Sequence, residues 1–146
     1  MAGARTKCDY ILNHCLYFTA NSLARLITRM AEEEFSVTGI SPSHAYLMML
    51  VNQNPGITQN ELAQKLALAP STVTRFVDAL AQGGYLARKV EGRESHLYAT
   101  DRGLQLQDKI DAAWQALYQR YTAILGQEQS AKLAEMIDEA TRKLEA

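Results

Sequence analysis

Two short helix signals follow each other between residues 58 and 84, and they constrain the fold more than any other feature. The first helix opens at residues 58–61 (TQNE), a T-x-x-E capping box, and ends near Ala67. The second has Pro70 at a first helical position and ends at Gly83-Gly84. Two helices joined by a few residues are typical of the helix-turn-helix arrangement, in which the second helix enters the DNA major groove.

The second helix has one apolar and one polar face. Apolar side chains at Val73, Phe76, Val77 and Leu80 fall at i, i+3, i+4 and i+7, so they predict the buried face. Arg75 lies on the other face and is the first candidate for a base contact. A guanidinium can donate two parallel hydrogen bonds to guanine, worth about 1–3 kcal/mol of discrimination. The alternative is a surface ion pair with Asp78 at i+3.

Three short hydroxyl side chains share the polar face with that arginine: Ser71, Thr72 and Thr74. Hydroxyl groups of this size suit phosphates and base edges. Capping of the helix start is the alternative for Ser71 and Thr72.

A hairpin with a charged tip is predicted next. Residues 85–90 and 95–100 have strand character, and residues 91–93 (EGR) form the turn. Leu86 and Val90 are expected to face inward. Lys89 and Arg88 are candidates for phosphate contacts, although strand charges often just face water.

Helices are predicted on both sides of this segment. Residues 8–34 contain no Pro or Gly and predict one long helix, and a second runs from Ser41-Pro42 to about Asn52. After the hairpin, one helix to about Leu125 is closed by Gly126, and a last amphipathic helix follows. The terminal helices carry apolar residues that a monomer of this length would not readily cover, which favours an interface: Leu12, Leu16, Trp114, Leu117 and Ile137.

The expected fold class is therefore mostly α (α+β), a winged helix-turn-helix with N- and C-terminal dimerisation helices. We expect an N-terminal helix in the dimerisation region over 1–40 and a DNA-binding lobe over 41–103. C-terminal dimerisation helices are expected over 104–146.

Composition supports a folded chain and excludes several classes. The 146 residues are 47% hydrophobic and 21% charged, which is ordinary for one soluble domain. No apolar run approaches membrane-span length and no signal peptide is visible, so a cytoplasmic protein is expected. Phosphate loops, nucleophile elbows and metal-ligand spacings are absent from the sequence, so we expect no enzyme, cofactor or metal site. The net charge of −1 gives no general sign of nucleic acid.

Four segments together resemble the MarR family of bacterial winged-helix transcription regulators. They are residues 71–80 (STVTRFVDAL), 84–88 (GYLAR), 91–93 (EGR) and 99–103 (ATDRG). The family's wing carries D-x-R and ends in L-T-x-x-G. Arg93, Thr100 and Gly103 match that pattern, whereas Glu91 replaces Asp and Ala99 replaces Leu.

The resemblance implies a homodimer, held by the first and the last two helices, that binds a palindromic site in double-stranded DNA and acts as a repressor. It also implies that Arg93 enters the minor groove, whose negative potential attracts arginine. A merely solvated turn arginine is the alternative. Two-fold symmetry places half-site centres about 34–36 Å apart.

The resemblance further implies control by a small-molecule or redox effector. His14, Tyr17 and Tyr46 are candidates for a pocket that takes a small aromatic or phenolic compound, with core packing as the alternative. Cys15 lies where a hydroperoxide-sensing branch of the family has its reactive cysteine. An inert, buried cysteine is the alternative there. The rival function for the whole chain is a winged-helix module for protein contact or non-specific DNA binding.

Overall fold

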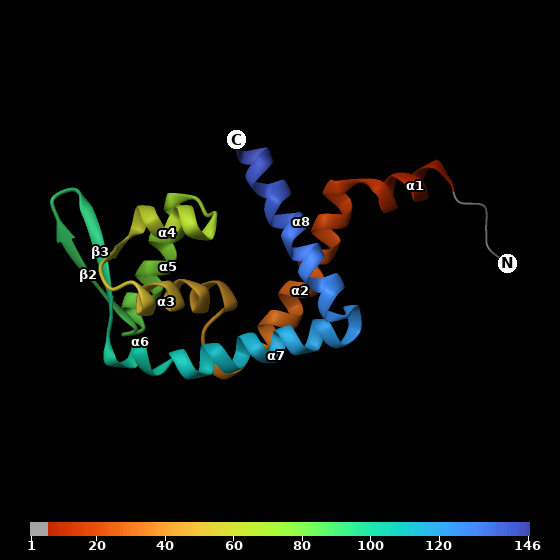
Figure 1. Cartoon of the computed structure of the whole chain (residues 1–146). Coiled ribbons are helices and arrows are strands. Elements are labelled where there is room, and N and C mark those ends of the chain that lie inside the picture. The colour runs from red at the N-terminus through yellow and green to blue at the C-terminus, as the bar shows by residue number, and fades with distance from the viewer. Residues whose placement is uncertain (1–5) are drawn as a thin grey trace.

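The computed structural model describes residues 6–146, and its elements follow the expected order (Figure 1). They are α1 (Lys7–His14), α2 (Leu16–Phe35), η1 (Ser36–Thr38), α3 (Pro42–Gln53), β1 (Ile57–Thr58), α4 (Gln59–Leu66), α5 (Pro70–Gln82), β2 (Leu86–Glu91), β3 (Glu94–Ala99), α6 (Asp101–Gln105), α7 (Gln107–Leu125) and α8 (Gln127–Glu145). The predicted fold class is confirmed: helices dominate, and the strands form one small antiparallel sheet.

The helix starts agree with the capping signals in the sequence. Ser41 caps α3 by accepting a hydrogen bond from the backbone N–H of His44, with Pro42 at the first helical position. The Thr58 side chain accepts from the N–H of Glu61, and the Glu61 side chain accepts from the N–H of Thr58. This reciprocal capping box fixes the start of α4.

Two predicted helices are broken in the structure. The segment over 8–34 divides at Cys15, whose extended backbone (ψ 119°) lets α1 leave the direction of α2. The segment after the hairpin divides at Leu106, between α6 and α7. No Pro or Gly occupies either junction, so the sequence carries no breaker signal at these two points.

The sheet has the strand order β1-β3-β2. β2 and β3 form the predicted hairpin, paired from Leu86 opposite Ala99 to Glu91 opposite Glu94. β1 is only two residues long and was not predicted, because a pair of residues shows no alternation. The expectation that Val90 faces inward is wrong: its side chain is 68% exposed, and the buried part of β2 ends at Leu86.

The core of the winged lobe forms around α3, which packs against α2, α4, α6, α7 and β3. Gly103 in α6 lies close to the backbone just before β2. A Cβ atom at this position would come within 2.1 Å of the Tyr85 carbonyl oxygen. Only glycine fits there, which gives a physical reason for the final position of the ATDRG motif. The largest fully buried side chains are those of Phe35, Leu47, Met48, Leu62, Leu80, Leu97, Ile110, Val51, Val73 and Val77.

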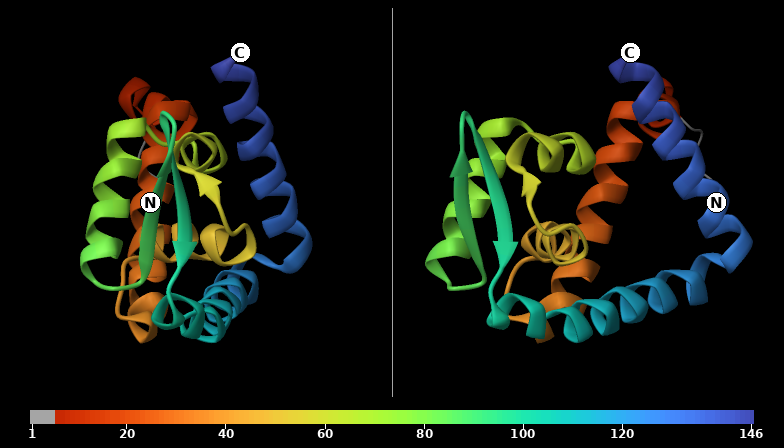
Figure 2. Two further views of the ribbon diagram at one scale, coloured as in Figure 1. Left: turned by 90° about the vertical axis from the view of Figure 1, so that its left-hand side faces the viewer. Right: turned by 60° about the vertical axis from the view of Figure 1, so that its left-hand side comes forward.

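Among the terminal helices, α2 and α7 pack against α3 of the winged lobe, whereas α1 and α8 extend away from it (Figure 1). α7 leads away from the lobe, and α8 then turns back at an angle to α7 (Figure 2). Four of the five apolar residues expected at an interface are exposed in the single chain: Leu12, Leu16, Trp114 and Ile137. Leu117 is instead buried in the core. No helix in the described part of the chain is long and apolar enough to cross a membrane.

Candidate nucleic-acid interface

The second helix of the helix-turn-helix, α5, has the predicted buried face. Val73, Val77 and Leu80 are buried, and Phe76 packs against the core at its edge. Ala69 occupies the N-cap position, and no side chain caps the helix. Ser71 and Thr72 therefore do not act as caps. Ser71 is exposed and Thr72 half-buried on the polar side of the helix.

The side chain of Thr74 is exposed, but its hydroxyl is already hydrogen-bonded within the lobe. Its hydroxyl donates to the Pro70 carbonyl at 3.1 Å and accepts from the Gln59 side-chain amide at 3.1 Å. Because Gln59 is the first residue of α4, this contact ties the start of one helix to the other. Thr74 therefore differs from Ser71, whose hydroxyl makes no hydrogen bond among the described residues.

Arg88 joins the wing to both helices of the helix-turn-helix. Its Nε donates to Gln59 at 3.1 Å, and its guanidinium forms an ion pair with Asp78 of α5. We call Gln59, Thr74, Asp78 and Arg88 the Arg88 bridge. An arginine engaged in this way is a positioning group, so the structure disfavours Arg88 as a phosphate contact. The sequence analysis missed this bridge, since Asp78 and Arg88 are ten residues apart.

Arg75 keeps a free guanidinium as a result. Asp78, its alternative partner, is held by Arg88, and Arg75 forms no ion pair among residues 6–146. Its Cζ atom lies 5.7 Å from the centre of the Phe76 ring. That ring in turn packs edge-on against His44 of α3, with 4.6 Å between the ring centres. Arg75 is thus exposed, and the Phe76 ring beside it is held in place by His44.

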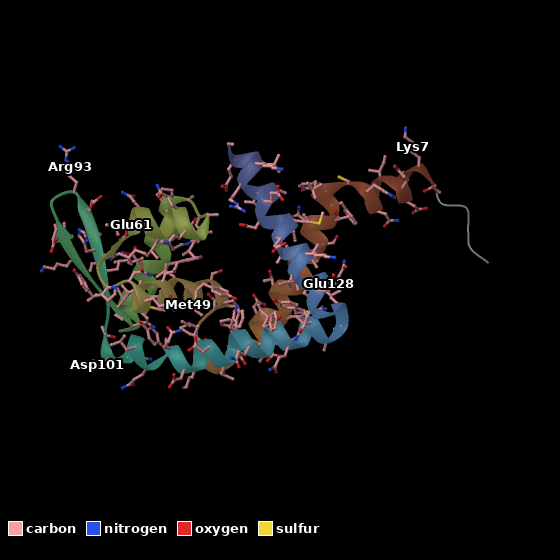
Figure 3. The ribbon with its side chains drawn as sticks, viewed as in Figure 1. Lys7, Met49, Glu61, Arg93, Asp101 and Glu128 are labelled. Carbon is pink, nitrogen blue, oxygen red and sulfur yellow. The ribbon has the colours of Figure 1, made fainter. Side chains whose placement is uncertain are left out.

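The wing presents Arg93 at its tip. Arg93 follows Gly92, whose φ of +63° makes the tight turn, and its side chain points away from the body (Figure 3). No ion pair holds Arg93 in the part of the chain that the structure describes. Glu91, at the acidic position of the wing motif, instead lies 3.4 Å from Lys89. Both of those side chains are exposed, so this pair holds Lys89 only weakly.

A small polar cleft of about 130 Å³ connects the wing tip to the start of α4. Arg93, Glu94 and Ser95 form one side, and residues 58–60 form the other. His96 of β3 supports this region, because its Nδ1 lies 2.9 Å from the Gly56 carbonyl oxygen. The arginine at the tip therefore lies on the same side of the lobe as the first residues of α4.

The three candidate effector residues are not brought together within one chain. His14 is exposed on α1, where its ring stacks on Tyr10 at 4.0 Å, and Tyr17 is 79% exposed on α2. Tyr46 is half-buried on α3, and burial raises the pKa of its phenol, with a smaller contribution from Tyr121. Tyr46 lines a cleft.

That cleft lies between α3 and α7 and has a volume of about 360 Å³. The sequence analysis missed its α7 side because Trp114 was assigned to a dimer surface. Its lining residues are Tyr46, Met49, Ile110, Asp111, Trp114 and Gln115.

The cysteines make no disulfide. Cys15 is half-buried at the junction of α1 and α2, and Cys8 is exposed. No group of three or more His, Cys, Asp or Glu side chains that could hold a metal ion is found among the described residues.

Residues 40–90 match the model of the MarR family. This part of the chain is therefore similar to the MarR family. A curated relative, the HTH-type transcriptional repressor MdtR of Bacillus subtilis (strain 168), is 24% identical over 105 residues, which are 70% of this chain and 68% of the relative. The match covers α3, α4, α5 and most of β2, the elements that carry Arg75 and the Arg88 bridge.

Solved structures extend this likeness to nearly the whole MarR-family fold. A mutant MarR from E. coli complexed with operator DNA has a TM-score of 0.79 at 19% identity, over 90% of this chain and 96% of that one. The PcaV transcriptional regulator of Streptomyces coelicolor, in complex with its natural ligand, has a TM-score of 0.79 at 25% identity. The match covers 90% of this chain and 94% of that one. The recognition of the family from the sequence is confirmed.

Proposed function

We propose that this chain is a transcription regulator of the MarR family, acting as a repressor, that binds a palindromic site in double-stranded DNA as a homodimer. The observation that carries the proposal is the free guanidinium of Arg75 on the exposed face of α5, left unpaired because Arg88 holds Asp78. A guanidinium presented from the N-terminal half of a recognition helix suits the acceptor pair of guanine.

The other polar residues have distinct proposed roles. Ser71 and Thr72 contact phosphates or base edges, and Lys89 contacts a phosphate. Arg93 enters the minor groove, to which its position at the exposed tip is suited. Thr74 acts mainly by orienting α5, since its hydroxyl is already hydrogen-bonded to Pro70 and Gln59.

The dimer is proposed from the apolar surface of the terminal helices. Leu12, Leu16 and Ile137 are exposed on α1, α2 and α8, and apolar surface of this extent normally marks an interface. In this proposal, residues 1–40 and 104–146 form the dimerisation region, and residues 41–103 form the DNA-binding lobe. The curated relative's description as a repressor favours that sign of regulation.

Control by a small-molecule effector is proposed as well. The PcaV structure was solved with its natural ligand, and this chain has a cleft of about 360 Å³ that includes the candidate Tyr46. His14 and Tyr17 would have to reach such a site from the partner subunit. Cys15 stays a candidate for redox control, with an inert thiol as the alternative.

The test is selection of duplexes from a random pool by the purified protein. A specific regulator enriches a palindrome, and Arg75→Ala should then lose discrimination at the contacted base pair by about 1–3 kcal/mol while retaining salt-dependent binding to any duplex. Lys109→Ala is the control, because Lys109 is an exposed cation on α7, outside the proposed DNA-binding surface.

The two rival functions give different results in the same selection. A non-specific binder retains duplexes without enriching a sequence, and a protein-interaction module retains none. Either result would contradict the proposal.

A further inference from the structure

The cleft between α3 and α7 contains one charged side chain, and that charge is negative. Among its lining residues, Asp111 is the one carboxylate, and no Lys, Arg or His is present. We infer that this cleft binds an aromatic cation, an amine or quaternary ammonium group attached to an aromatic body. That class is opposite in charge to the phenolic anions that the family resemblance suggested.

The walls of the cleft suit the aromatic body of such a ligand. Ile110 is buried at its base and Met49 is half-buried beside it, so both present apolar surface. A volume of about 360 Å³ accommodates a small aromatic molecule. Methionine is flexible and polarizable, which lets the wall adapt to the shape of the ring.

Two aromatic side chains of the lining suit the positive group. Trp114 is 46% exposed and stacks on Tyr118, with ring centres 5.4 Å apart and an angle of 9° between the planes. Tyr46 packs against Phe35 at 5.6 Å. These neighbours limit the movement of both rings. The face of an aromatic ring is electrostatically negative and attracts a cation, most strongly for tryptophan.

The Asp111 carboxylate is exposed and has no ion-pair partner among the described residues. One of its oxygens accepts a hydrogen bond from the Gln107 side chain at 2.9 Å, which leaves the other oxygen available to a ligand. No Lys, Arg or His within residues 6–146 forms an ion pair with Asp111. A bound anion would therefore face an unpaired negative charge, whereas a cation would supply the missing partner.

Hydrogen bonds connect this carboxylate to the winged lobe. Gln107 donates to Asp111 and accepts from Asn52 of α3 at 2.9 Å, and Asn52 also lies 3.2 Å from the Gly103 carbonyl oxygen. A cation on Asp111 competes with the Gln107 hydrogen bond and so acts on the contact between α3, α6 and α7. The regulatory role of the cleft rests on the proposed function, but cation binding itself does not.

The test uses the full-length protein and three probes of similar size but different charge: benzyltrimethylammonium, benzyl alcohol and benzoate. Trp114 is the only tryptophan of the chain, so its fluorescence reports directly on the cleft. We expect benzyltrimethylammonium to bind at least about tenfold more tightly than benzoate at equal ionic strength, with benzyl alcohol between them.

Asp111→Asn is the decisive variant, since it removes the charge and keeps the shape. It should remove most of the preference for the cation while leaving benzyl alcohol binding unchanged. Asp108→Asn is the matched control, because Asp108 is an exposed carboxylate on the same helix but outside the cleft. Circular dichroism spectra of both variants are compared with that of the unchanged protein to check that they fold.

Three outcomes overturn the inference: benzoate binds as tightly as the cation, Asp111→Asn leaves the preference intact, or no probe changes the fluorescence. Duplex binding, measured on the same preparations, tests the proposed function separately. If the protein binds its selected duplex but shows no charge preference among the probes, only the inference about the cleft is contradicted. If it binds the cation but no duplex, the proposed function is contradicted and the cation site is supported.

Discussion

At the scale of single residues, Arg75 and Thr74 show what a sequence can and cannot establish about a site. The polar face of α5 predicted both as DNA contacts, and the structure places both on that face. The sequence could not predict that Thr74 is hydrogen-bonded to Gln59, or that Asp78 is occupied by Arg88. Those contacts join residues separated by 10 and 15 positions, and only the folded chain brings them together.

His44 is a residue whose effect on stability should depend on pH. Its ring packs against Phe76, and burial lowers its pKa from the usual 6.5. The unfolded chain therefore binds a proton at His44 more readily than the folded chain does. Stability from this residue is present above about pH 6.5 and should be lost as the pH falls through the lowered pKa of the folded state.

The measurement is the free energy of unfolding by urea between pH 5 and pH 8. His44→Gln should flatten the acid side of this profile compared with the unchanged protein. His14→Gln, which alters an exposed ring on α1, serves as the control. A His44→Gln profile parallel to that of the unchanged protein would contradict the prediction.

At the scale of elements, the helix starts were predictable and two junctions were not. Capping side chains and prolines act locally, so Ser41-Pro42 and the box at residues 58–61 indicate helix starts in the sequence itself. The breaks at Cys15 and Leu106 have no such local signal, and β1 exists only because β3 lies beside it. These features depend on tertiary contacts.

The Arg88 bridge makes a prediction about the wing and α5 together. Arg88→Ala removes the hydrogen bond to Gln59 and frees Asp78, which can then pair with Arg75 at i+3. Discrimination between the selected site and a base-substituted site should fall by about 1–3 kcal/mol. The double variant Arg88→Ala with Asp78→Asn should recover part of it, because Arg75 is free again.

Lys89→Ala is the matched comparison on the same strand. It should weaken binding to all duplexes about equally and reduce the salt slope by about 1, as expected for a phosphate contact. Titrations by fluorescence anisotropy at several salt concentrations separate the two behaviours. Equal effects of the two substitutions on discrimination would refute the positioning role of Arg88.

At the scale of the whole molecule, the proposed dimer depends on the exposed apolar surface of the terminal helices. Ile137→Glu places a charge on α8 in the proposed interface and should shift the protein from dimer to monomer in sedimentation measurements, because a buried unpaired charge is costly. Val90→Glu is the control, since Val90 is also apolar and exposed but lies on the wing. A dimer unaffected by Ile137→Glu would place the interface elsewhere.

The Arg88 bridge has a consequence for how such a regulator can evolve and be controlled. Because Arg88 connects the hairpin to both helices of the lobe, we expect the wing and α5 to move together. In the proposed dimer, a ligand at the α3–α7 cleft then changes the separation and tilt of the two lobes, while the base pattern preferred by each lobe stays the same. Residues of the cleft would therefore determine which ligand the protein responds to, and residues of the lobe would determine which base sequence it binds. Each set can change in evolution without the other.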